Sequence, residues 1–181
     1  MKCNRMLALG LVSGLVLAML GGTAPVLDAA QTTTNLDVTA TVTANCTVAA
    51  TPVAFGNYLG SPITANGTLT VNCTRDLPYA MALGAGNNLG TTPEGAFTRQ
   101  MTNLGQTPSG FIPYFVYQDV TLTTEWGDTG CLAASSYTSG TCQSSSGTGT
   151  DQVFNVYGRT GTGGPQPNGT YSDVVVATVV F

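Results

Sequence analysis

Short runs rich in Val, Thr, Tyr and Phe alternate with clusters of Gly, Asn, Pro and Ser along most of this chain, and no sustained apolar repeat of 3.6 residues interrupts them. Such runs are typical of strands, and the clusters between them are typical of turns. The predicted strands are residues 68–74, 77–83, 111–119, 152–159 and 171–181. Asn66-Gly67 and Gly86-Asn87 are predicted turns, because both residue types tolerate positive φ. This order predicts an all-β antiparallel sandwich.

The first thirty residues have the composition of a secretory signal peptide. Lys2 and Arg5 precede an apolar run at residues 7–20, and small residues follow that run. The run is too short to cross a bilayer comfortably, so we expect cleavage and export, with a mature start near Gln31. About 150 residues then remain, which is the size of one domain with a full core.

The charged residues of the mature chain argue against nucleic-acid binding. After residue 30 there is no Lys and no His, and the only basic residues are Arg75, Arg99 and Arg159. No basic stripe is therefore present for a phosphate backbone. Without a His base, a Gly-x-Ser-x-Gly elbow or a phosphate-binding glycine motif, neither an enzyme nor a cofactor is expected.

Three acidic residues lie close together in the sequence. Asp119, Glu125 and Asp128 suggest paired catalytic carboxylates at first sight. Gly127 and Gly130 beside them favour turn chemistry instead, since Asp and Gly are common partners in turns.

Four cysteines follow the signal peptide: Cys46, Cys73, Cys131 and Cys142. An even number behind a secretory signal predicts two disulfides made in an oxidising compartment. Three pairings are possible, and we favour Cys46–Cys73 with Cys131–Cys142, because each pair closes a loop between neighbouring predicted segments. The spacings and the lack of His ligands argue against a metal site.

An alternating segment precedes the first mature cysteine. Leu36, Val38, Ala40 and Val42 are apolar, and Asp or Thr stands between them. A period of two predicts a strand with one buried face. The pattern alone fits two structures equally well: a first strand within its own sheet, or a strand donated to another molecule.

The last eleven residues are apolar on both faces of a predicted strand. One face carries Val174, Val176, Thr178 and Val180; the other carries Val175, Ala177, Val179 and Phe181. This pattern is typical of a central strand that is buried on both sides. Two further stretches lack a clear strand pattern: residues 84–110, and the polar loop 127–151, which is interpreted as a tolerated insertion.

Three aromatic residues have two readings. Tyr114, Tyr117 and Trp126 are candidates for a sugar-stacking platform, but core packing is the favoured role for Tyr114 and Trp126 because large aromatics dominate cores.

Several motifs resemble the spore coat protein U domain and the archaic, Csu-type chaperone–usher pilins. They are VNCT at 71–74, PYFVYQD at 113–119, WGD at 126–128 and the ending GTYSDVVVATVVF. The motif residues are Tyr114, Tyr117, Asp119, Trp126, Gly127 and Asp128. The chain departs from the family pattern in the loop after Asp128, which is longer than usual.

The resemblance implies an incomplete immunoglobulin-like sandwich completed by a strand from the next subunit. Residues 1–30 are then the signal peptide, 31–42 the donor extension and 43–181 the pilin domain. Leu36, Val38, Ala40 and Val42 are the implied donor side chains. Val174, Val176, Thr178, Val180 and Phe181 belong to the strand that edges the acceptor groove and pairs with a chaperone.

The implied partners are other pilin subunits, a periplasmic chaperone and an outer-membrane usher, with export through the periplasm to the cell surface. The implied role is a pilus subunit in attachment and biofilm formation. The lack of Lys in the mature chain excludes isopeptide-linked pili, and no N-terminal apolar helix of the type IV kind follows Gln31. Two other functions stay open: a self-contained adhesin or carbohydrate-binding module, and a coat protein of spores or cysts.

Overall fold

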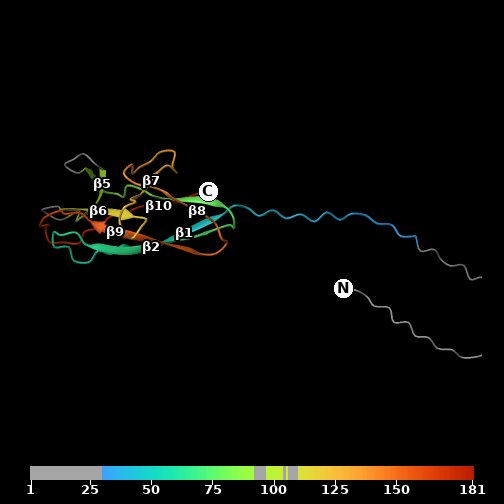
Figure 1. Cartoon of the computed structure of the whole chain (residues 1–181), viewed down its shortest axis with the longest axis horizontal. Coiled ribbons are helices and arrows are strands. Elements are labelled where there is room, and N and C mark those ends of the chain that lie inside the picture. Colours follow the sequence, from blue (N-terminus) through green and yellow to red (C-terminus); the bar gives the residue numbers. More distant parts are fainter. Residues whose placement is uncertain (1–29, 92–96, 104, 106–109) are drawn as a thin grey trace, which may run out of the picture. The chain divides into compact units, whose positions relative to one another are not determined.

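The described residues, 30–91, 97–103, 105 and 110–181, form β-strands joined by turns and irregular segments. The structure is a computed structural model, shown in Figure 1. Its strands are β1 (Cys46–Thr51), β2 (Thr64–Cys73), β3 (Pro78–Leu83), β4 (Leu89–Thr91), β5 (Phe97–Thr102), β6 (Phe111–Tyr117), β7 (Trp126–Thr129), β8 (Gln143–Ser146), β9 (Gln152–Thr160) and β10 (Ala177–Val180). Within the described ranges, no helix is long and apolar enough to cross a membrane.

Two antiparallel sheets enclose one core. The larger has six strands in the order β1-β2-β9-β6-β5-β4, and the smaller has three in the order β10-β3-β8. Both sheets contribute to the same cluster of buried side chains: Leu69, Val71, Cys73, Tyr79, Met81, Leu83, Tyr114, Val116, Trp126 and Val156. The predicted all-β antiparallel architecture is confirmed.

Alternation in the sequence is matched by alternation in burial. In β6, Ile112, Tyr114 and Val116 are buried, while the residues between them are partly or fully exposed. The predicted strands at 68–74, 77–83, 111–119 and 152–159 therefore correspond to β2, β3, β6 and β9. Their apolar faces supply the core.

The predicted turn at Asn66-Gly67 is wrong, because both residues lie inside β2. Gly67 permits the close approach of β1 to β2: a Cβ on it would lie 2.7 Å from the carbonyl oxygen of Thr51. Gly86 does adopt a left-handed φ of 81°, as the predicted turn requires.

The segment before β1 contains no strand. Residues 30–45 are all exposed, with Leu36 and Val38 each 86% exposed and Val42 82% exposed. The chain divides into two units between Ala40 and Thr41. In this structure the segment is therefore not a first strand of its own sheet, which was one of the two structures that its pattern allowed.

Candidate functional site: an open groove between two sheet edges

Four strands stand at the edges of the two sheets in the described part of the chain, β1 and β4 in the larger and β8 and β10 in the smaller, and two of them, β1 and β10, border the groove described below. β1 pairs only with β2, and β10 pairs only with β3. The predicted strand 171–181 is observed only over β10, which lies at the edge of its sheet, so the prediction of a central C-terminal strand is wrong. Although residues 174–181 are apolar on both faces, Val176, just before β10, is 65% exposed and Phe181, just after it, is 57% exposed. A free apolar edge of this kind favours pairing with another chain.

A groove of about 510 Å³ lies beside these edges. One wall is formed by residues 50–53 and Phe55, which end β1 and follow it, and the other by residues 171–175 and Ala177, which lead into β10. Its floor is formed by side chains of the core: Leu69, Leu83, Tyr114, Val116 and Val156. The groove therefore opens directly onto the apolar interior of the sandwich.

A second cavity of about 790 Å³ adjoins the first, since Val53, Phe55, Met101 and Tyr171 line both. Its remaining lining is more polar and includes Asn57, Tyr58, Gln166, Asn168 and Thr170. The open region thus has an apolar part over the core and a polar part between the loops 53–59 and 166–171.

The C-terminal wall of the groove is anchored by the carboxylate of Asp173. It accepts hydrogen bonds from the backbone N–H of Asn87 at 2.9 Å, the side-chain amide of Asn88 at 3.1 Å and the hydroxyl of Tyr114 at 2.7 Å. Burial, and then the hydrogen bond to Asp173, raise the pKa of Tyr114 above its usual range. The wall is therefore tied to the core through the floor residue Tyr114.

The side chains of this wall divide by face. Val175, Ala177 and Val179 pack against the core, whereas Val174 and Val176 are 61% and 65% exposed. Of the residues expected at the acceptor edge, Val174 lines the groove, and Val176, Thr178, Val180 and Phe181 are not part of its lining. The chaperone-pairing role of this strand stays a prediction.

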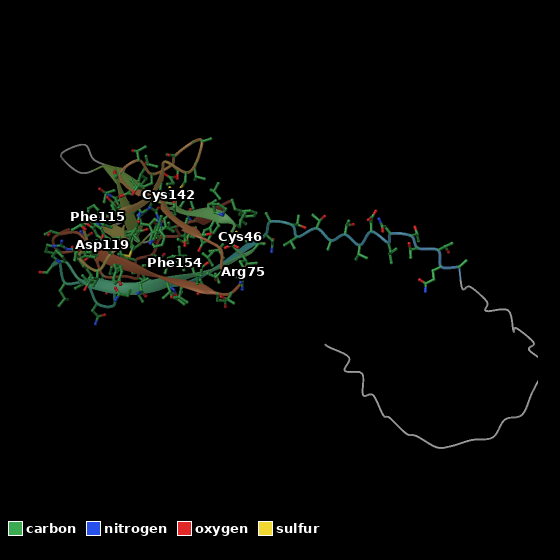
Figure 2. All side chains as sticks on the ribbon, turned by 45° about the vertical axis from the view of Figure 1, so that its right-hand side comes forward. Cys46, Arg75, Phe115, Asp119, Cys142 and Phe154 are labelled. Carbon is green, nitrogen blue, oxygen red and sulfur yellow. A yellow bond between two sulfur atoms is a disulfide. The ribbon has the colours of Figure 1, made fainter. Side chains whose placement is uncertain are left out.

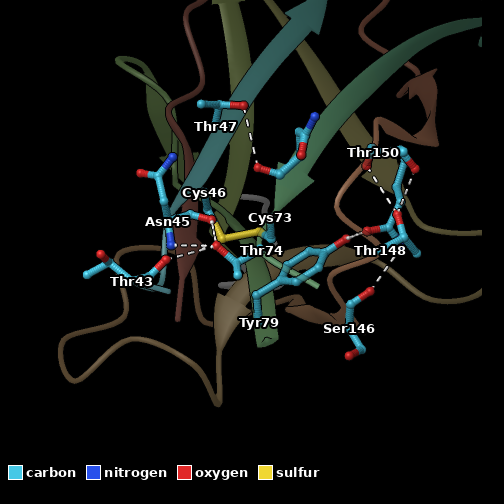
Figure 3. The surroundings of a disulfide bond; sticks show 12 residues. Thr43, Asn45, Cys46, Thr47, Cys73, Thr74, Tyr79, Ser146, Thr148 and Thr150 are labelled. Carbon is cyan, nitrogen blue, oxygen red and sulfur yellow. Dashed lines mark hydrogen bonds between the residues drawn. A yellow bond between two sulfur atoms is a disulfide. The ribbon is translucent and has the colours of Figure 1, made fainter. Parts of the chain in front are cut away.

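The Cys46–Cys73 disulfide fixes the start of β1 (Figure 3). Next to it, the hydroxyl of Thr74 accepts a hydrogen bond from the N–H of Asn45 at 3.0 Å and donates one to the carbonyl of Thr43 at 3.2 Å. The predicted Cys46–Cys73 pairing is confirmed. The chain is held to the domain from Thr43 onward, which is where the donor extension was expected to end.

The family-motif aromatics have different surroundings. Tyr114 and Trp126 are buried, and the indole N–H of Trp126 donates to the carbonyl of Met81 at 3.0 Å, in agreement with a packing role. Tyr117 is half-buried, and its ring centre lies 6.4 Å from that of Phe115, which is labelled in Figure 2. These side chains therefore do not form one sugar-stacking platform.

The acidic residues organise turns and loops. Asp119 accepts hydrogen bonds from the hydroxyl of Thr121 and the N–H of Thr124, which lower its pKa. Asp128 accepts bonds from the N–H and hydroxyl of Ser136, both at 2.6 Å, and from the N–H of Tyr137 at 2.9 Å. The predicted turn chemistry is thus observed at Asp119, whereas Asp128 lies in β7 and binds the loop that follows it, and Glu125 accepts a hydrogen bond from the hydroxyl of Tyr137. No group of three or more His, Cys, Asp or Glu among the described residues could hold a metal ion.

A buried arginine, which the sequence analysis counted only as a charge, binds three carbonyl groups around the core. Arg99 donates to the carbonyl oxygens of Leu83 at 2.8 Å, Gly84 at 2.9 Å and Trp126 at 2.9 Å. Its guanidinium lies 3.8 Å from the centre of the Tyr137 ring. Burial lowers its pKa. Nothing in the sequence pattern distinguishes Arg99 from a surface arginine on a strand.

The second predicted disulfide is not formed in this structure, in which Cys131 and Cys142 are free thiols. The Cys131 thiol instead donates a hydrogen bond to the carbonyl oxygen of Asp128 at 3.8 Å.

The fold and the groove define a class of protein: an antiparallel β-sandwich whose core is open between two unpaired edges. Residues 32–178 match the Spore Coat Protein U domain, and the chain belongs to this family. Protein U of Myxococcus xanthus is 33% identical over 167 residues, which cover 85% of this chain and 87% of that protein. The resemblance inferred from the motifs is confirmed.

One solved structure adds a likeness in fold. It is the CsuC–CsuE chaperone–tip adhesion subunit pre-assembly complex from the archaic chaperone–usher Csu pili of Acinetobacter baumannii. One of its chains superposes with a TM-score of 0.52 at 20% sequence identity, over 78% of this chain and 41% of that chain. This chain thus spans about two fifths of the length of that structural relative, and the likeness shows a shared fold. Neither this relative nor the family is described as an enzyme.

Proposed function

We propose that this protein is a structural subunit of an archaic chaperone–usher pilus, polymerised without covalent links by donor-strand complementation. One observation carries the proposal: the groove exposes the floor of the core between two unpaired strand edges, while an alternating apolar segment of the same chain lies uncovered. In the fibre, residues 36–42 of one subunit fill the groove of its neighbour.

The donor segment and the groove suit each other in length. Residues 36–42 and the wall 171–177 are equally long, about 20 Å each at the ~3.3 Å rise of a strand. Full burial of Leu36, Val38, Ala40 and Val42 contributes on the order of 6–12 kcal/mol before the entropy of ordering is subtracted. Pairing with the β1 and β10 edges satisfies the backbone polar groups, and the Asp and Thr face stays in water.

Assembly by this route calls for helper proteins. Before assembly, an open groove beside free edges promotes aggregation, so a periplasmic chaperone is proposed to cover it and an outer-membrane usher to exchange the chaperone strand for the donor. The Cys46–Cys73 disulfide is consistent with export. The structural likeness to a chain of a chaperone–subunit complex supports such a partner. The finished fibre is proposed to lie on the cell surface and to support attachment and biofilm formation.

The test compares two charged variants of the donor segment on unboiled and boiled denaturing gels. Wild-type fibres are expected to give a ladder of multimers that boiling reduces to monomer. Val38→Asp places an unpaired charge in the groove, which is costly, and is expected to abolish the ladder while the chaperone complex still forms. Thr39→Asp adds the same charge to the polar face and is expected to keep the ladder. A normal ladder from Val38→Asp contradicts the proposal.

The family description favours a second candidate, a coat protein of spores or cysts built from the same domain. Immunolabelling of vegetative and dormant cells separates the two. Fibres on growing cells support the pilus subunit, and label confined to the surface of the dormant stage supports the coat protein. A monomer whose residues 31–42 resist protease, together with glycan binding, would instead indicate a self-contained binding module.

A further inference from the structure

The loop between β7 and β8 brings two cysteines together. The N–H of Thr129 donates to the carbonyl of Gly140, and the N–H of Cys142 donates to the carbonyl of Thr129, both at 3.3 Å. These bonds align the two ends of the loop. Cys131 lies two residues after Thr129, and Cys142 follows Thr141, which is bridged to Thr129. The backbone therefore holds both cysteines beside Thr129.

The environment of the pair allows oxidation. Both residues are partly exposed, so a redox partner can reach them. In the same chain, Cys46 and Cys73 are already joined.

We propose that Cys131 and Cys142 form a second disulfide after export, and that this bond locks the loop 131–142 onto the core. Each thiol gives up its hydrogen as the sulfur–sulfur bond forms. The two electrons and two protons pass to the disulfide of a thiol oxidase, which is reduced to a dithiol.

The locked loop covers the side of the core that Arg99 holds. Tyr137 lies between the two cysteines in the sequence, is fully buried, stacks on Arg99 and donates its hydroxyl proton to Glu125 in a hydrogen bond. Arg99 in turn holds the carbonyl of Leu83, a residue on the groove floor. A disulfide between Cys131 and Cys142 limits the conformations that the loop can adopt once Tyr137 has left its buried position. The bond therefore favours the folded loop.

The chemistry is tested on the exported protein by alkylation without reductant, followed by trypsin. The only trypsin sites after residue 31 are Arg75, Arg99 and Arg159, so Cys131 and Cys142 share the peptide 100–159, and Cys46 and Cys73 share the peptide that ends at Arg75. We expect peptide 100–159 to be unalkylated and lighter by two hydrogen atoms than its reduced form. Chymotryptic cleavage at Tyr137 should leave two fragments that separate only on reduction.

Alkylation of both cysteines without reductant overturns the proposal, and so does a cross-link between peptide 100–159 and the peptide that ends at Arg75. The lock is tested with the double variant Cys131→Ser, Cys142→Ser. Its Tm is expected to fall by about 5–10 °C, and cleavage by protease within residues 130–141 should be at least about tenfold faster.

Should the double variant fail to fold, wild-type protein reduced under conditions that leave the buried Cys73 bridged gives the same comparison. Equal Tm and equal cleavage rates in the bridged and unbridged forms contradict the proposal that the disulfide stabilises the loop 131–142. Because these readouts use the monomer, they do not depend on whether the chain polymerises.

Discussion

The core of this sandwich has two margins that differ in how they are covered. On one margin, the loop 130–142 folds back over the interior, with Tyr137 on Arg99 and the carboxylate of Asp128 binding the loop backbone. On the other, the side chains of Leu69, Val116 and their neighbours form the floor of an open groove. The same interior is closed by its own chain on one side and left open on the other.

The difference shows what each margin is suited to. The closed margin uses polar contacts that belong to one chain: a cation over a ring, carbonyls bound by a guanidinium and a carboxylate bound by backbone N–H groups. The open margin offers apolar surface and unpaired strand edges, which any extended segment with the right period can satisfy. The closed margin therefore stabilises the subunit, and the open one provides for association.

Filling the groove with a strand from the same chain is expected to change the stability of the protein most. A copy of residues 36–42, added after Phe181 through a short turn, supplies the missing strand intramolecularly. At about 6–12 kcal/mol for the buried side chains, less the cost of ordering, Tm should rise by roughly 20 °C, as measured by calorimetry. The fused chain should also run as a monomer on unboiled gels, because its groove is occupied.

The matched control for the fusion carries Val38→Asp in the added copy only. It has the same length and linker but cannot bury its side chain, so its Tm should stay near that of the unfused chain. Equal stabilisation by both copies would mean that the linker, rather than the groove, is responsible.

Weakening the contacts of the loop 130–142 is expected to lower the stability of the protein, by less than the fusion raises it. Asp128→Asn removes the charge that accepts bonds from Ser136 and Tyr137 and is expected to lower the free energy of unfolding by about 1–3 kcal/mol at pH 7. Denaturant titration measures this difference against the wild type. Residues of the groove should be unaffected in their exchange with deuterium.

The pH dependence of this effect has a definite sign. Burial alone would raise the pKa of Asp128, but the hydrogen bonds from Ser136 and Tyr137 outweigh it and lower the pKa. The stabilisation is therefore present above the unfolded value of about 3.9 and is lost as pH falls through the lower folded value. The difference in the free energy of unfolding between wild type and Asp128→Asn should become smaller toward about pH 2. A constant gap would mean that the carboxylate charge does not matter.

The sequence allowed prediction of the parts of the fold where apolar alternation supplies one buried face, as in β6 and β9. It did not reveal β1, whose residues after Cys46 are exposed, or β8, which is the polar run 143–146 inside the expected loop. Gly67 was misassigned because a glycine that permits close approach looks the same in sequence as one that permits a turn. Arg99 was missed because its partners are carbonyls from three distant segments, which leave no local signal.

The groove itself was predicted only through family resemblance. Apolar residues on both faces of 171–181 indicated a central strand, because a sequence does not state whether the second face is covered by the same molecule. The structure leaves that face exposed, and this exposure is what links the pattern to association.

The smallest expected change in the free energy of unfolding comes from comparing the inner and outer faces of the groove wall. Val175 packs against the core, and its neighbour Val176 is 65% exposed. Val175→Ala removes buried methyl groups and is expected to lower the free energy of unfolding by about 1 kcal/mol, whereas Val176→Ala should change it by less than about 0.5 kcal/mol. Denaturant titration of the two monomeric variants gives both values, and each serves as the control for the other because the chemical change is the same. If Val176→Ala cost as much as Val175→Ala, the outer face of the segment before β10 would be covered in the monomer and would not be open to a partner.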